Sequence, residues 1–172
     1  RAWASACGVN SGARRAHCAG IANDLRRAVE RGQLSLAFQP IVRLADGRVT
    51  AFEALLRWNH PDKGMISPAS FIPIAESSGL IVPIGNWVLE QSCKLAATWR
   101  KNLSVAVNIS PAQFKSGQLV DVVCAALAKY GLAPHRLELE ITESLLLEKS
   151  YETLEVLRSL KELGVVIALD DF

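Results

Sequence analysis

Residues 137–142 read LELEIT, and the alternation in this stretch decides the fold class. Successive side chains of a β-strand point to opposite faces, so the leucines and the isoleucine form one apolar face that packs against helices. Glu138, Glu140 and Thr142 then share the other face, which points inward. A carboxylate in that position must be paired, hydrogen-bonded or bound to a cation.

On both sides of this stretch, strand patterns and helix patterns alternate. Strands are predicted at residues 34–44, 48–56, 104–109, 136–141 and 165–169. Helices are predicted at residues 68–77, 80–100, 119–130 and 150–163. Asp46 and Gly47 indicate a tight hairpin between the first two strands, which should therefore be antiparallel. The later alternation predicts an α/β fold whose parallel strands are joined by helical crossovers.

Composition and charge limit the class of protein. Of 172 residues, 50% are hydrophobic and 21% charged, which is typical of a globular chain. The net charge of +2 gives no reason to expect DNA, RNA or a membrane surface as a partner, and no apolar run is long enough to cross a bilayer. The four cysteines have no metal-site spacing, so we expect a reducing, cytoplasmic compartment. Residues 1–19 are predicted to be a linker or the tail of an upstream region, a short amphipathic helix starts near Ile21, and residues 20–172 form the domain.

Oxygen-bearing side chains recur where four predicted strands end. They are Glu53, Asn108, Glu140 and the pair Asp170 and Asp171. Taken singly, each has an ordinary explanation: a surface glutamate, an amide that satisfies a turn, or a helix cap. Their recurrence at strand ends favours a shared cation site, because these ends face the mouth of a (β/α) barrel. Oxygen donors without histidine or cysteine suit Mg²⁺ or Mn²⁺.

The stretch EALLRW at residues 53–58 resembles the signature of EAL domains, bacterial enzymes that hydrolyse cyclic di-GMP. The resemblance continues in order through FQPIV, HPDKGMISPASFIPIAE, GNWVLEQSC, VNIS, LELEITES and GVVIALDDF, from about residue 21 to residue 172. It implies a (β/α)8 TIM-type barrel with an antiparallel first strand, of which this chain carries only about the first five strands.

The resemblance also implies roles for individual residues. Glu53, Asn108, Glu140 and Asp170 resemble metal ligands, and Asp171 resembles the ligand shared with a second metal. Glu53, Asp170 and Asp171 would then be the catalytic residues.

Three further residues match family positions outside this ligand set. Gln39 and Arg57 resemble substrate contacts, and an arginine suits a phosphate. Glu143 resembles the glutamate that anchors the loop after the fifth strand, although an acidic residue at a helix N-terminus explains it equally well.

By resemblance, the parent protein hydrolyses cyclic di-GMP to linear pGpG by two-metal phosphodiester cleavage. The chain of residues 1–172 alone is expected to be inactive, because part of the family's site lies outside it. A homodimer through the barrel and an upstream diguanylate cyclase or sensory domain are further expectations. Two alternatives stay open: a non-catalytic EAL-like receptor or protein-interaction domain, and an unrelated metal-dependent barrel such as an enolase-type enzyme.

Overall fold

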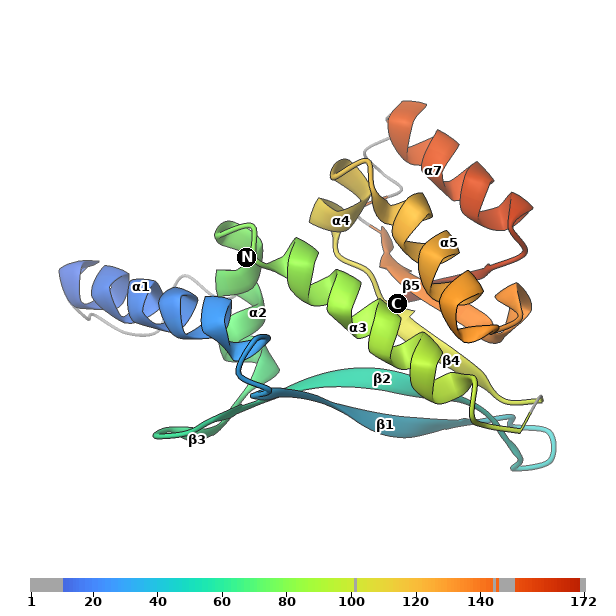
Figure 1. Cartoon of the computed structure of the whole chain (residues 1–172), viewed down its shortest axis with the longest axis horizontal. Helices are drawn as coiled ribbons and strands as arrows, with labels where there is room; N and C mark the ends of the chain where they lie inside the picture. Colours follow the sequence, from blue (N-terminus) through green and yellow to red (C-terminus); the bar gives the residue numbers. More distant parts are fainter. Residues whose placement is uncertain (1–10, 101, 144, 146–150, 171–172) are drawn as a thin grey trace.

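A computed structural model describes residues 11–100, 102–143, 145 and 151–170, with side chains from residue 19 onward and without that of Asp170. A six-stranded sheet lies at the centre, with the strand order β1-β2-β4-β5-β6 and β3 paired to β2. Helices α3, α5 and α7 lie along one side of this sheet, whereas α1 extends away from it beside α2 (Figure 1). The strands are β1 (Leu34–Val42), β2 (Val49–His60), β3 (Gly64–Ile66), β4 (Ser104–Asn108), β5 (Leu137–Thr142) and β6 (Val166–Asp170). The helices are α1 (Ser11–Ala28), α2 (Pro68–Ser77), α3 (Ile81–Ala96), α4 (Pro111–Lys115), α5 (Leu119–Tyr130), the 3-10 turn η1 (Pro134–Arg136) and α7 (Tyr151–Glu162).

The strand directions agree with the sequence prediction. β1 and β2 are antiparallel, and β2, β4, β5 and β6 are parallel to one another. The hairpin between β1 and β2 turns at Gly47, whose φ of 68° lies in the left-handed region that glycine adopts without strain. The turn is longer than two residues, since β1 ends at Val42 and β2 begins at Val49. Within it, the Arg43 carbonyl accepts the Gly47 N–H, and the Arg43 guanidinium lies 2.7 Å from the Asp46 carboxylate.

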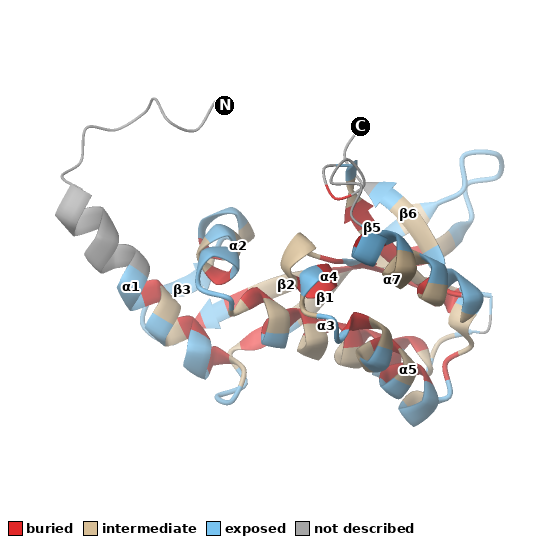
Figure 2. Ribbon diagram, turned by 90° about the horizontal axis from the view of Figure 1, so that it is seen from above, coloured by how far each residue is buried: buried red, intermediate tan, exposed pale blue. Residues whose placement is uncertain are grey.

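The main core lies between the sheet and its helices. Leu137, Leu139 and Ile141 are at most 1% exposed, while the alternate residues of β5 are half-buried, as the LELEIT pattern predicts. Figure 2 shows the same contrast along the helices, whose buried stripes face the sheet. One face of the sheet therefore packs against the helices, and the other face carries the polar side chains.

Several local features differ from the sequence prediction. α1 begins at Ser11, well before Ile21, and so includes part of the segment predicted as a linker. That segment is rich in alanine and arginine, which favour helix even without an apolar period. The short elements β3 and α4 were not predicted, because three to five residues are too few for a periodic pattern. None of the described helices is both long and apolar enough to span a membrane.

Candidate metal and substrate site

The sheet register places the predicted site residues on one face. Gln39 lies opposite Glu53 across the β1–β2 pair, and Asn108 lies opposite Glu140 across the β4–β5 pair. Cross-strand partners point to the same side of a sheet, so these residues share the face that turns away from the helical core. Arg57 shares this face as well, because it lies four positions after Glu53 along β2.

Side chains of β2 and β4 are joined directly on this face, although β2 continues to His60, so that Glu53 lies within the strand and not at the predicted strand end. The Asn108 amide nitrogen donates a hydrogen bond of 2.8 Å to Oε1 of Glu53. The backbone partner of Glu53 is Ala106, so the bond runs diagonally to the residue two positions further along β4. An asparagine that donates through its nitrogen can still offer its carbonyl oxygen to a cation. The bond therefore fixes two candidate oxygen ligands relative to each other.

β5 and β6 extend the same arrangement. Glu140 is half-buried on β5, and Thr142, one step further along that face, pairs with Asp170 in the backbone register. The ends of β4, β5 and β6 thus bring Asn108, Glu140 and the Asp170 backbone to one edge. The side chain of Asp170 and the whole of Asp171, both predicted ligands, lie outside the described residues. Glu143 follows β5 directly and is exposed.

A cavity opens beside these strand ends. It has a volume of about 290 Å³, and its polar lining includes Arg57, Asn108, Glu140 and Thr142. The remaining wall is largely apolar and comes from β2, α2, α3 and the segment from β4 to the start of α4. The Arg57 guanidinium donates a bond of 3.1 Å to the carbonyl of Leu56. The cavity therefore combines a cationic group, oxygen donors and an apolar wall, which is a common composition for a site that binds a small molecule.

One wall of the cavity is fixed by a capping box that the sequence analysis missed. Ser110 is the N-cap of α4, and its hydroxyl accepts a bond from the Gln113 N–H while the Gln113 side chain accepts one from the Ser110 N–H. The Gln113 side chain, only 2% exposed, lies against Gly85 of α3. The Ser-x-x-Gln spacing of residues 110–113 is a known signal for this motif and could have located it.

The described residues alone do not form a finished metal centre. Among them, no three His, Cys, Asp or Glu side chains are close enough together to hold a cation. Glu53, Asn108 and Glu140 fit the donor set that Mg²⁺ or Mn²⁺ prefers, since all three offer oxygen. They form the described portion of a candidate oxygen-ligand site.

The fold and this site define a class of α/β proteins that carry oxygen ligands at the C-terminal ends of parallel strands. Within that class, the chain belongs to the EAL domain family, whose sequence pattern matches residues 22–172. The chain is 51% identical over 152 residues to an uncharacterized signaling protein of Caulobacter vibrioides, covering 88% of this chain and 19% of that protein. It is 44% identical over 156 residues to the bifunctional diguanylate cyclase/cyclic di-GMP phosphodiesterase MucR of Pseudomonas aeruginosa, covering 88% of this chain and 23% of MucR.

A solved structure confirms the predicted fold. The PaMucR phosphodiesterase in its c-di-GMP complex superimposes with a TM-score of 0.85 at 43% identity, over 89% of this chain and 64% of that one. The chain thus spans about a fifth of the two curated relatives and about two-thirds of this solved domain. The family and the α/β fold class predicted from the sequence are confirmed, and an enolase-type barrel is excluded.

Proposed function

We propose that the protein containing this chain hydrolyses the phosphodiester of cyclic di-GMP to give linear pGpG, with the help of divalent cations. The observation that carries the proposal is the bond between Asn108 and Glu53 beside the cavity of Arg57 and Glu140. Support also comes from MucR, whose name includes cyclic di-GMP phosphodiesterase, and from its structure in complex with c-di-GMP.

Each site residue has a defined task in this proposal. Glu53, Asn108 and Glu140 hold cations together with Asp170 and Asp171. Bound Mg²⁺ or Mn²⁺ would supply charge neutralisation at the phosphodiester and activation of water. Glu53, Asp170 and Asp171 are the proposed catalytic residues because they would lie against the reacting groups.

The substrate contacts come from neighbouring strand positions. Arg57 provides a guanidinium that can make two parallel bonds to a phosphate, and its position in the cavity lining suits that task. Gln39 lies opposite Glu53 and is proposed to contact the substrate at the same edge. Glu143 is proposed to anchor the loop after β5. The apolar wall of the cavity would then exclude water from the substrate.

The test measures conversion of cyclic di-GMP to pGpG by the full-length protein with Mg²⁺ or Mn²⁺. Glu53→Ala should lower kcat by more than about 100-fold, because it removes a proposed metal ligand. The matched control is Glu155→Ala, which removes an exposed carboxylate paired with Arg158 on α7 and should leave turnover unchanged.

Two outcomes would contradict the proposal. Near-normal turnover by the Glu53 variant would refute the metal assignment. Tight binding of cyclic di-GMP without turnover by the unmodified protein would instead favour the non-catalytic receptor. The homodimer, the upstream domain, the cytoplasmic compartment and the division at residue 19 stay predictions.

A further inference from the structure

α2 contacts α1 and also lines the candidate site, through two adjacent rows of its residues. Pro68, Ile72 and Glu76 follow one another at helical spacing and line the cavity. Phe71 and Ala75 form the adjacent row of the same helix, one position before Ile72 and Glu76, and are fully buried in the core that α1 shares. α1 contacts α2 directly (Figure 1). Because packed interiors transmit displacement, a shift of α1 would move the α2 wall of the cavity.

At the end of β2, successive residues also have different surroundings. Arg57 faces the cavity, whereas the next residue, Trp58, is fully buried on the opposite side of the strand. The Trp58 ring packs edge-on against Phe71 with a centroid distance of 5.5 Å. The Asn59 N–H donates a hydrogen bond of 2.9 Å to the carbonyl of Gln33, which lies in the connection between α1 and β1. The strand end that presents Arg57 therefore rests on the core beneath α1.

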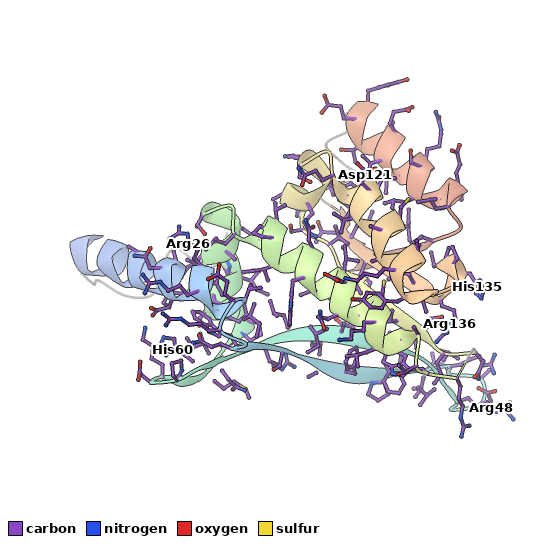
Figure 3. All side chains as sticks on the ribbon, viewed as in Figure 1. Arg26, Arg48, His60, Asp121, His135 and Arg136 are labelled. Atoms are coloured by element: carbon purple, nitrogen blue, oxygen red, sulfur yellow. The ribbon has the colours of Figure 1, made fainter. Side chains whose placement is uncertain are left out.

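A group of three polar side chains fastens α1 to this strand end. Asp24 of α1 accepts bonds at one carboxylate oxygen from Nε2 of His60, at 3.1 Å, and from Nζ of Lys63, at 3.0 Å. His60 ends β2 and is 8% exposed, and Figure 3 shows it beneath α1. Its Nδ1 accepts the N–H groups of Asp62 and Lys63, at 3.1 and 3.3 Å. These two donors assign the proton of the neutral ring to Nε2, which donates it to Asp24.

The electrostatics of the group support a persistent contact. The bonds from Lys63 and then from His60 hold the pKa of the Asp24 carboxyl below its usual value, so the charged form is favoured. Asp24 itself is more than a third exposed, at 39%, which limits the stability it adds to the whole domain. Both bonds meet at one oxygen of Asp24, between α1 and the end of β2. This geometry suits a role in fixing the orientation of α1 relative to β2.

We propose that Asp24 is a positioning residue. Through His60 and Lys63 it fastens α1 to the end of β2, and α1 thereby holds Arg57 and the α2 wall in the orientation that binds substrate. The identity of that substrate rests on the proposed function, whereas the mechanical link does not. Asn108 and Glu140 lie on β4 and β5, outside this contact, and Glu53 lies on β2 but seven residues before His60, whereas Arg57 is only three residues from it. Asp24 therefore acts on substrate binding more than on the chemical step.

The experiment compares the full-length protein with its Asp24→Ala variant. Hydrogen exchange without ligand should become faster in α2 and the end of β2 but not in α5. With cyclic di-GMP as substrate and Mg²⁺ present, KM should rise by about threefold or more, while kcat stays within about twofold. The rise in KM should remain below the ~100-fold loss that a displacement of about 1 Å can cause. Asp24→Asn should recover part of the KM effect, because its amide oxygen still accepts the His60 bond.

The matched control is Asp46→Asn, which weakens a similar exposed contact with Arg43 in the β1–β2 turn and should change neither measurement. Unchanged exchange in α2 and β2, an unchanged KM, or an equal effect of the control would overturn the proposal. If the unmodified protein does not hydrolyse cyclic di-GMP, the proposed function fails, and the exchange data alone decide whether Asp24 fastens α1 to β2.

Discussion

Replacement of Gly85 by alanine tests how closely α3 packs on the start of α4. A Cβ added at Gly85 would lie nearer to the Gln113 amide group than van der Waals contact permits. A flexible side chain could usually move aside, but that of Gln113 is 2% exposed and its amide oxygen accepts the Ser110 N–H. The new methyl group must therefore either strain the helix contact or break the capping box.

Two opposing contributions set the magnitude. Alanine favours a helix interior over glycine by about 1 kcal/mol. Overpacking a filled interior costs about 1–3 kcal/mol, and loss of a helix cap costs about 1 kcal/mol. Because Gln113 has little room to move, the unfavourable contributions should prevail. We expect Gly85→Ala to lower the free energy of unfolding by about 1–3 kcal/mol.

Urea unfolding followed by circular dichroism measures this change, and a second background makes the test specific. In a Gln113→Ala protein the obstructing amide is absent, so Gly85→Ala should become neutral or stabilising by up to about 1 kcal/mol. Gly20→Ala in α1 is the matched control, because its Cβ would meet no atom within 4 Å, and it should be stabilising. An equal loss of stability from Gly85→Ala in both backgrounds would refute the packing explanation.

Three further predictions concern single side chains. Arg57→Lys should fold normally but bind cyclic di-GMP about tenfold more weakly by calorimetry, since lysine cannot make two parallel bonds to a phosphate; equal affinity would remove Arg57 from the site. Arg136 is 7% exposed and donates hydrogen bonds to the carbonyls of Ala96, Arg100 and Leu103. Arg136→Met should therefore lower the free energy of unfolding, measured with urea, by about 2–4 kcal/mol. A change within about 0.5 kcal/mol would show that these bonds add little. Burial raises the pKa of the Cys93 thiol to about 12 from a usual value of 9.0. The folded state therefore favours the neutral thiol, so its contribution is full below about pH 9 and declines as the pH rises toward 12. The free energy of unfolding should fall between pH 8 and pH 11, and it should fall less steeply in Cys93→Ala than in the unmodified protein. Identical slopes in the two proteins would contradict the raised pKa of Cys93.

Much of the fold could be predicted because its signals are local. The β5 alternation was confirmed, and α2 and α5 have the predicted bounds, since each has an apolar stripe and a clear end. The glycine at the end of α5, Gly131, has the left-handed φ of 64° that its position after the helix predicts. By contrast, α3 ends at Ala96, before the predicted end, although the residues that follow still suit a helix. The N–H groups of Thr98 and Trp99 bond to carbonyls three residues back, which replaces the α-helical pattern with a tighter turn.

The sequence by itself determined which side chains could form the site. Period-two alternation assigns Glu140 to the polar face of β5, and family resemblance marks Glu53, Asn108 and Arg57 as site residues. These conclusions need only the geometry of a single strand and the order of the elements. They hold before any two strands are placed side by side.

Only the tertiary structure decided which of these residues meet. The stagger between β2 and β4 brings Asn108, rather than the directly opposite Ala106, to the carboxylate of Glu53. The packing of α1 likewise brings Asp24 to His60, across a separation along the chain that carries no local signal. Such contacts depend on how strands shear and helices pack, because those three-dimensional relations, and no short-range pattern, set the distance between remote side chains.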